Sequence, residues 1–115
     1  MSQRRVVVTG MGIVSPVGNT LASAWDNIRN GRSGIGRITH FDPSAYTAQI
    51  AGEVRDFDVK SIVPPKDAKK MDTFIHYGLA ASFQALDDAG LAITEANAER
   101  IGALIGSGIG GVRGI

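Results

Sequence analysis

Cysteine is absent from the 115 residues, and histidine occurs only twice, at His40 and His76. Without cysteine, a disulfide framework, a thiolate metal site and a cysteine nucleophile are all excluded within these residues. Two histidines so far apart in sequence argue against a zinc site, so we expect no metal and no cofactor here. A structural or surface role is the favoured interpretation of each histidine.

The chain also lacks a long apolar run and a strong charge of either sign. No apolar stretch approaches the ~18 residues that a membrane span needs. The net charge of +1 offers no basic surface for nucleic acid. Arg4 and Arg5 before Val6–Val8 faintly resemble a signal peptide, but Thr9 and Gly10 interrupt the apolar segment, and no Ala-x-Ala cleavage pattern follows. We therefore expect a cytoplasmic protein.

Helical periodicity is strongest between Phe74 and Ala89, where apolar residues recur along one stripe. Asp72 stands at the N-cap position, and Gly90 stands just past the end, where a left-handed glycine commonly ends a helix. Glycine inside a helix costs roughly 1 kcal/mol relative to alanine. Gly78 and the small residues around it therefore predict that another element lies close against the helix. A shorter helix is predicted at residues 21–30.

Two apolar segments without polar alternation predict buried strands. The first covers residues 5–14, where Gly10 and Gly12 predict a bulge or a close backbone neighbour. The second covers Ile101–Ile105. With the long helix between them, the two strands would form a βαβ crossover in a parallel sheet.

The interval between the first strand and the long helix is far too long for a plain crossover, so we interpret residues 19–71 as an insertion. Within it, residues 31–48 are predicted to be a loop, Gln49–Val54 a short strand, and Pro65 the start of one helical turn. A parallel sheet of two strands is not a complete fold. The predicted fold class is therefore α/β, with residues 1–115 as the incomplete N-terminal part of a larger protein.

A glycine-rich segment, Gly106–Gly111, follows the second predicted strand and matches the pattern G-x-G-x-x-G. A dinucleotide site also requires a helix that opens there and an acidic residue ~20 positions further on. Tight packing of backbone is the favoured interpretation. Ser107 resembles a nucleophile elbow, but that pattern needs glycine where Ile105 and Ile109 stand, so we reject it.

Seven segments, taken together and in order, resemble the start of a β-ketoacyl-acyl-carrier-protein synthase, and most of all the elongating branch, synthase II. The segments are Arg5–Asn19, Trp25, Gly31 with Ser33–Ile35, Phe41–Asp42, Ile50–Val54, Lys69–Asp72 and Ile105–Gly111. No single segment is specific, but the ordered set is. The resemblance covers the whole chain and only the first part of such an enzyme.

The resemblance implies a thiolase-like fold, with five layers (αβαβα) in the full enzyme and only part of its first half present here. It also implies a homodimer that condenses an acyl thioester with malonyl-acyl carrier protein and releases CO₂. In the family a cysteine takes the acyl chain and two histidines assist. His40 and His76 match neither histidine, so no catalytic residue is assigned, and residues 1–115 alone are expected to be inactive.

Two groups of site residues follow from the same resemblance. Lys66, Lys69 and Lys70 are the densest cationic group in the chain. Alone, such a group is usually a solvated face, but the resemblance implies docking of the acidic acyl carrier protein. Ile109 is the only large side chain between Gly106 and Gly111, and its matching position lines the acyl-chain tunnel at the dimer interface.

Two other functions stay open at this point. Chain-length factors of polyketide systems resemble the synthases but lack the nucleophile, and they act as binding partners. A Rossmann-type oxidoreductase is the weaker alternative. A cysteine at the start of a buried helix beyond these residues would indicate the synthase, and a glutamine there would indicate the partner. A suitably spaced acidic residue after Gly111 would indicate the oxidoreductase.

Overall fold

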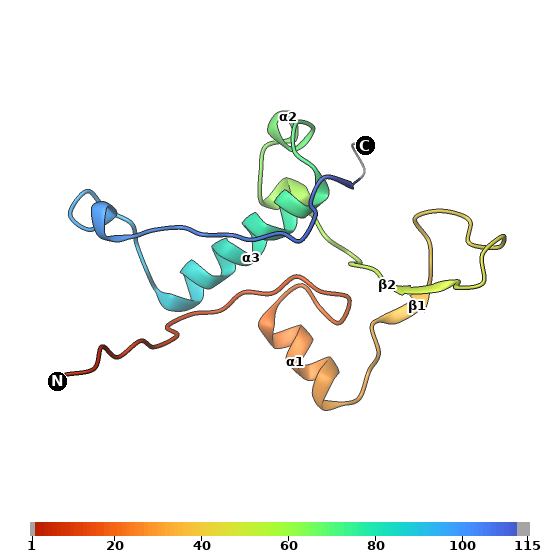
Figure 1. The fold of residues 1–115 in the computed structure, drawn as a ribbon, viewed down its shortest axis with the longest axis horizontal. Coiled ribbons are helices and arrows are strands. Elements are labelled where there is room, and N and C mark those ends of the chain that lie inside the picture. Colours follow the sequence, from red (N-terminus) through yellow and green to blue (C-terminus); the bar gives the residue numbers. More distant parts are fainter. Residues whose placement is uncertain (1, 113–115) are drawn as a thin grey trace.

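The computed structural model describes residues 2–112, in which three helices and a two-stranded sheet are joined by long extended segments (Figure 1). The elements are α1 Leu21–Arg29, β1 Ile35–Arg37, β2 Ile50–Gly52, α2 Pro65–Ala68 and α3 Thr73–Ala89, with the 3₁₀ turns η1 Val59–Ser61 and η2 Ala98–Arg100. Among these residues no helix is long and apolar enough to cross a membrane.

Helix α3 confirms the predicted long helix and both of its ends. The side chain of Asp72 accepts a hydrogen bond from the amide of Thr73 at 2.7 Å, which satisfies one of the unpaired donors of the first turn. At the other end Gly90 adopts φ 61°, and its N–H reaches the carbonyls of Asp87 and Leu86. A left-handed conformation favours glycine, so Gly90 ends the helix as the sequence indicates.

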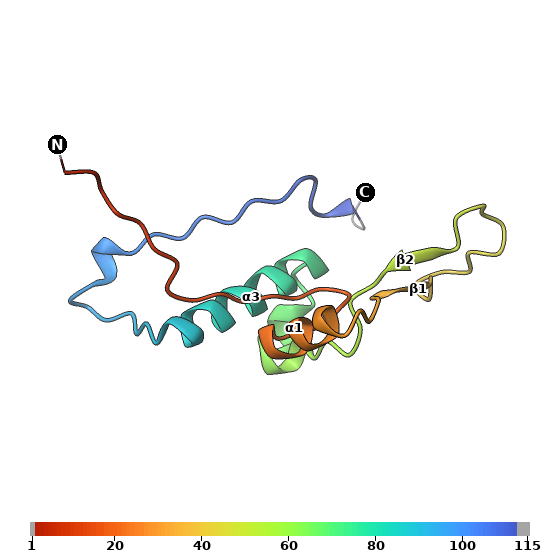
Figure 2. The ribbon, with the colours of Figure 1, turned by 90° about the horizontal axis from the view of Figure 1, so that it is seen from below.

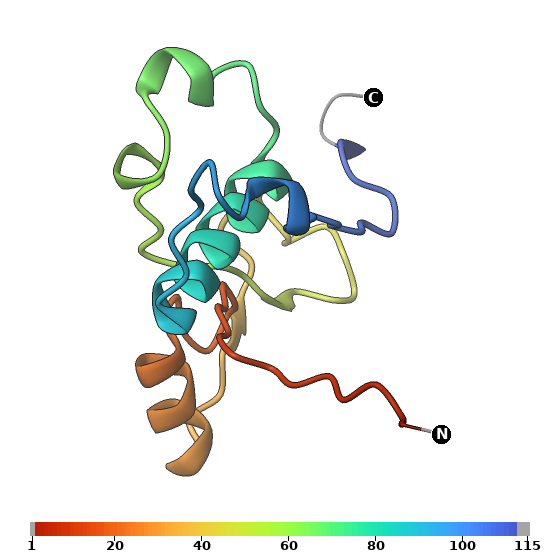
Figure 3. The same cartoon turned by 90° about the vertical axis from the view of Figure 1, so that its left-hand side faces the viewer.

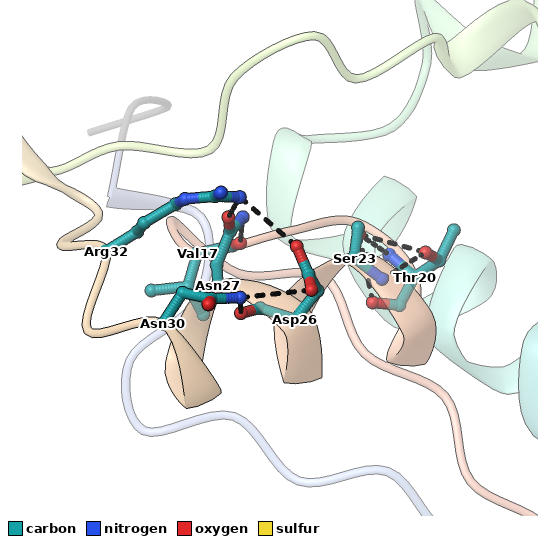
Figure 4. A network of polar contacts seen from close by, with 7 residues as sticks. All are labelled: Val17, Thr20, Ser23, Asp26, Asn27, Asn30 and Arg32. Carbon is teal, nitrogen blue, oxygen red and sulfur yellow. Dashed lines mark hydrogen bonds and ion pairs between the residues drawn. The ribbon is translucent and has the colours of Figure 1, made fainter.

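Helix α1 confirms the predicted short helix, and it is held by polar contacts at both ends (Figure 4). Thr20 and Ser23 form a reciprocal capping box at its start. Near its end, Arg32 forms an ion pair with Asp26 at 3.1 Å, and Asn27 donates to a backbone carbonyl of the preceding turn at 2.6 Å. Since the ion pair is largely exposed, it contributes little to stability.

The predicted strand at residues 5–14 is wrong in this structure: the segment is extended but pairs with no strand among residues 2–112. Its first part runs away from α3 (Figures 1 and 3), and Val6 is 93% exposed. A strand is defined by a hydrogen-bonded neighbour, and no described residue provides one for this segment. Its later part binds side chains of α3 instead.

Two side chains of α3 take the place of a neighbouring strand. The amide of Met11 donates to the carboxylate of Asp88 at 2.9 Å, and the amide of Ile13 donates to the side-chain oxygen of Gln84 at 3.2 Å. The Gln84 nitrogen in turn donates to the carbonyl of Asn19 at 2.7 Å. Gln84 therefore binds the backbone at two positions, Ile13 and Asn19.

Gly10 and Gly12 have the close backbone neighbour that their spacing predicts, and this neighbour is α3. A Cβ added at Gly10 would lie 2.8 Å from the Cβ of Ala89, and one at Gly12 would lie 2.8 Å from the Cβ of Gln84 and would also collide with the carbonyl oxygen of Ala81. The small side chains of α3 thus admit another element, as predicted.

The second predicted strand, Ile101–Ile105, is also wrong in this structure. The segment runs alongside α3 without a strand partner (Figure 2), and Leu104 is 99% exposed. At Gly78 the Cγ2 of Ile105 lies 3.9 Å from the position of an added Cβ, which is ordinary van der Waals contact. The predicted βαβ crossover is therefore not formed among residues 2–112.

The sheet that does form is the antiparallel hairpin of β1 and β2, within the segment interpreted as an insertion. Ile35 pairs with Gly52, Gly36 with Ala51, and Arg37 with Ile50. Strand β2 confirms the short strand predicted at residues 49–54. Strand β1 lies in the segment predicted to be a loop, since its three residues carry no alternation that could be recognised.

The chain buries few side chains. Its radius of gyration is 17.5 Å, whereas a compact chain of this length has about 13 Å. Its accessible surface is 9395 Å² at a mass of 12.1 kDa, whereas about 6,000 Å² is typical of a compact monomer of that mass. The buried hydrophobic residues are Ala24, Val63, Ala68 and Ala80. Much apolar surface is consequently exposed.

Candidate functional site

The segment Gly106–Gly111, hereafter the glycine loop, folds back on the first turn of α3. Gly110 and Gly111 have φ angles of 60° and 55°, a conformation that residues with a side chain rarely adopt. The turn brings Gly110 against the ring of Phe74, where an added Cβ would lie 3.1 Å from Cζ. Tight backbone packing is thus found at Gly110 but not at Gly106 or Gly108, where an added Cβ would meet nothing within 4 Å. The helix that a dinucleotide site requires after Gly111 falls outside the described residues.

An open cleft of about 520 Å³ lies between this loop and the hairpin. Its walls come from β2 and the residue after β1, from the following turn, from the start of α3 and from the glycine loop. The lining residues are Ile38, His40, Phe41, Ala51, Gly52, Glu53, Val54, Asp72, Thr73, Phe74, Tyr77, Ser107, Gly110, Gly111 and Val112. Most of the lining is apolar, which suits an acyl chain better than a phosphate.

Ile109, the predicted acyl-pocket residue, stands beside the cleft and is not one of its lining residues. The residue is 82% exposed. The flanking Ser107 and Gly110 do line the cleft, so the loop carries Ile109 at the rim. Its predicted place in a tunnel at a dimer interface stays a prediction.

Glu53 is the buried acidic group of the cleft, with 6% of its surface exposed. Its carboxylate accepts hydrogen bonds from the amide and hydroxyl of Thr39 at 3.0 and 2.8 Å, and from the amide of His40 at 3.2 Å. The amide of Thr39 is the main cause that lowers the pKa of Glu53, and the neighbouring His40 acts in the same direction. Glu53 therefore holds the cleft wall while it remains ionised.

Sequence reasoning missed Glu53, although one signal was available. A carboxylate stands at the end of the apolar run Ile50–Gly52 and before Val54. Such a group is seldom buried without partners. Those partners lie 13 and 14 residues earlier in the chain, at His40 and Thr39, and nothing in the sequence indicates them.

Lys66, Lys69 and Lys70, hereafter the lysine turn, lie on and just after α2. Pro65 opens this short helix, as the sequence predicts. All three side chains are exposed, and none forms an ion pair with a carboxylate among residues 2–112. The turn directly precedes α3, so these charges stand at the same end of α3 as the cleft.

His76 connects α2 to α3. Its Nε2 lies 3.0 Å from the carbonyl oxygen of Ala68, the last residue of α2. This contact agrees with the structural role favoured for His76. Nowhere in residues 2–112 do three carboxylate, imidazole or thiol groups come together in a way that could hold a metal ion.

Comparisons with known proteins match the chain along most of its length. Residues 3–114 match the family model described as the β-ketoacyl synthase N-terminal domain. The chain is 59% identical over 112 residues to the 3-oxoacyl-[acyl-carrier-protein] synthase 2 of Vibrio harveyi, and 56% identical over 112 residues to the protein of the same name from Vibrio cholerae. Each match covers 97% of this chain, which spans 27% of the relative's length.

A solved structure supports the fold. The ishigamide ketosynthase/chain length factor matches 79% of this chain and 23% of its own, with a TM-score of 0.69 and 38% identity. The resemblance to a β-ketoacyl-acyl-carrier-protein synthase and the partial α/β, thiolase-like class are thereby confirmed. Nothing in these matches supports the Rossmann-type alternative.

Proposed function

Since the chain belongs to the β-ketoacyl synthase family through its N-terminal domain, we propose that the whole protein is an acyltransferase of fatty-acid elongation. It condenses an acyl thioester with malonyl-acyl carrier protein by a decarboxylative Claisen reaction. The observation that carries this proposal is the match to 3-oxoacyl-[acyl-carrier-protein] synthase 2 enzymes over 97% of the chain.

In the proposed reaction, a cysteine thiolate elsewhere in the protein attacks the acyl thioester and releases the carrier thiol. Loss of CO₂ from the malonyl thioester then leaves a carbanion that attacks the acyl-enzyme carbonyl. The new carbon–carbon bond displaces the cysteine and forms a 3-oxoacyl thioester. Two histidines, also elsewhere, stabilise the developing oxyanion. Residues 1–115 contain no cysteine, so this nucleophile is not among them. Their proposed role is to bind the carrier protein and to shape the acyl pocket.

The proposed architecture is a cytoplasmic homodimer with a five-layer thiolase-like fold, in which residues 1–115 form part of the first half. The exposed apolar segments support it. Val6–Val8 and Leu104 face solvent here, and apolar strands of this composition are usually buried on both faces. In the complete sheet, residues 5–14 and Ile101–Ile105 would gain the strand neighbours that they lack in this structure.

The proposed role of the lysine turn is to dock the acyl carrier protein, which is acidic. Three exposed ammonium groups on one short turn, without intramolecular ion pairs among the described residues, are available to a partner. Charge pairs at the rim of an interface mainly raise the association rate and weaken with salt. Ile109 is proposed to contact the acyl chain that the carrier protein delivers.

A nucleophile-lacking partner of the chain-length-factor type is the second candidate. One observation favours keeping it: the structural match is to a protein named as a ketosynthase/chain length factor. Acylation of the whole protein separates the two functions. Incubation with acyl-carrier protein should add one acyl mass to a cysteine of the synthase, whereas a chain-length factor would stay unmodified and would support condensation only with a catalytic partner.

Condensation and docking can be tested together in the whole protein. Wild type should form 3-oxoacyl-carrier protein from acyl- and malonyl-carrier protein. Lys66→Glu with Lys69→Glu should raise KM for the carrier substrates roughly tenfold at low ionic strength, with a smaller effect at high salt. Small thioester analogues should react as before.

The matched control is Lys60→Glu, which reverses a lysine on η1 outside the lysine turn. It should leave KM nearly unchanged. Equal loss with carrier-bound and small substrates would refute docking at the lysine turn, and absence of condensation in wild type would refute the proposed reaction.

A further inference from the structure

The ring of Phe74 is the surface on which the glycine loop rests. A Cβ added at Gly110 would lie 3.1 Å from Cζ and 3.2 Å from Cε2 of this ring. The same Cβ would lie 3.3 Å from the Oγ of Ser107. Gly110 thus lies against an aromatic ring edge, close to the hydroxyl of Ser107 from the same loop. It directly follows Ile109, so the ring fixes the backbone from which the Ile109 side chain projects.

We propose that Phe74 is a positioning residue that sets the acyl-chain length preference of the protein through Ile109. This inference rests on the proposed function, and it adds a residue on α3 that no sequence signal singled out. Phe74 lines the cleft and keeps 42% of its surface exposed. The ring therefore borders both the cleft and the loop that carries Ile109.

The support beneath the ring is rigid. Phe74 lies in the first turn of α3, directly after Thr73, whose amide binds the N-cap Asp72. The same Asp72 carboxylate lies 3.8 Å from a Cβ position at Gly111, so helix cap and loop approach each other at a second point. His76 ties this turn to α2. The backbone that carries the ring is therefore fixed by the helix cap and by the contact with α2.

The loop, by contrast, has no rigidity of its own. Gly106, Gly108, Gly110 and Gly111 add no side chains that could pack. A β-branched residue such as Ile109 has few χ1 choices, so the position of its side chain follows that of its backbone. Moving the ring should consequently move the Ile109 side chain relative to any acyl chain, and long primers should respond more than short ones.

The test uses the whole protein and a series of primer lengths, with the ratio of kcat/KM for the longest to that for the shortest primer as the readout. Phe74→Leu should change this ratio by about fivefold or more. Phe74→Tyr keeps the ring but adds an oxygen to Cζ, the atom nearest Gly110, and should change the ratio with little loss of Tm. Phe83→Tyr, at an exposed aromatic position further along α3, should leave it unchanged.

A double-mutant cycle decides whether Phe74 acts through Ile109. In an Ile109→Ala background, Phe74→Tyr should no longer alter the ratio. An equal change in both backgrounds, or a uniform loss at all primer lengths, would overturn the proposal while condensation itself continued. Wild type without condensation would instead overturn the proposed function, and the present inference with it. If the Ile109→Ala variant had the same ratio of kcat/KM values as wild type, Ile109 would not contact the acyl chain, and the proposal would be overturned.

Discussion

Glu53 accepts hydrogen bonds from both the backbone amide and the hydroxyl of Thr39, at 3.0 and 2.8 Å. One carboxylate therefore ties the residue that follows β2 to the connection that follows β1. The carboxylate is the acceptor in every one of these contacts. Its ionised form is therefore the form that holds the turn.

The first prediction concerns pH. The Thr39 amide and the other donors lower the pKa of Glu53 from its ordinary 4.5. A carboxylate with a lowered folded-state pKa stabilises the fold above its unfolded-state pKa, and this stabilisation is lost as pH falls through the folded-state value. Glu53→Gln should therefore destabilise the whole protein at neutral pH, and the difference should shrink below about pH 4.5.

Urea unfolding of both proteins at a series of pH values measures this difference. A Gln variant that stays equally destabilised at every pH would show that the shape of Glu53, and not its charge, holds the turn. Asp42→Asn is a suitable control. The pKa of Asp42 is also lowered, chiefly by the hydroxyl of Ser44, but this carboxylate is exposed on the connection between the two strands.

The second prediction concerns the approach of the N-terminal segment to α3. Gly12→Ala places a methyl group against the backbone of Ala81, which a helix cannot move aside. The expected cost is ~1–3 kcal/mol of unfolding free energy, as for other overpacked sites. Chemical denaturation of the whole protein provides the value.

Gly36→Ala is its matched control. A Cβ there would meet only the guanidinium of Arg55, the far end of a flexible side chain. Its effect should stay within about 0.5 kcal/mol. If Gly12→Ala lowered the unfolding free energy as little as Gly36→Ala does, the N-terminal segment would not lie against α3 in the whole protein.

The third prediction concerns the volume available at Ile109. Ile109→Phe in the whole protein should block long acyl primers and spare short ones, since overpacking of a narrow cavity costs ~1–3 kcal/mol, or roughly 5- to 150-fold in binding. Acyl-transfer rates across the primer series measure it. The control is Ile93→Phe, at an exposed isoleucine after α3. It should leave the acyl-transfer rate unchanged at every primer length. A uniform drop for Ile109→Phe would leave this residue with a role in the fold alone.

The fourth prediction concerns residues 1–115 by themselves. They contain no cysteine, so no acyl-enzyme can form on the nucleophile that the family uses. A malonyl-dependent condensation assay on the purified chain should give no turnover above the blank. Measurable product would place the chemistry on other residues and would contradict the proposed division of roles.

Local signals predicted the helices well, because caps and periodicity act over a few residues. Asp72 and Gly90 are examples, since each forms its defining hydrogen bonds within four positions. The strands at residues 5–14 and 101–105 were predicted from composition alone. A strand depends on a neighbour that composition does not identify, and among residues 2–112 these segments have none.

The site likewise has features that neighbouring residues predict and contacts that they do not. The lysine turn could be recognised from adjacent letters, and the structure confirms that it is exposed, although its role stays a prediction. The contact of Phe74 with Gly110 joins positions 36 residues apart through a loop with two left-handed glycines. The Thr39–Glu53 pair spans 14 residues. Neither contact has a signature in sequence spacing.

The contacts that hold the N-terminal segment to α3 join residues that are synthesised at different times. Met11 and Ile13 precede their partners Asp88 and Gln84 by 77 and 71 residues. At a synthesis rate of roughly 5–20 residues per second, those partners are added about 4–15 s after the segment itself. Val6–Val8 therefore leaves the ribosome before the helix that will anchor the neighbouring residues exists, and during that time a chaperone or another nascent chain can bind it first.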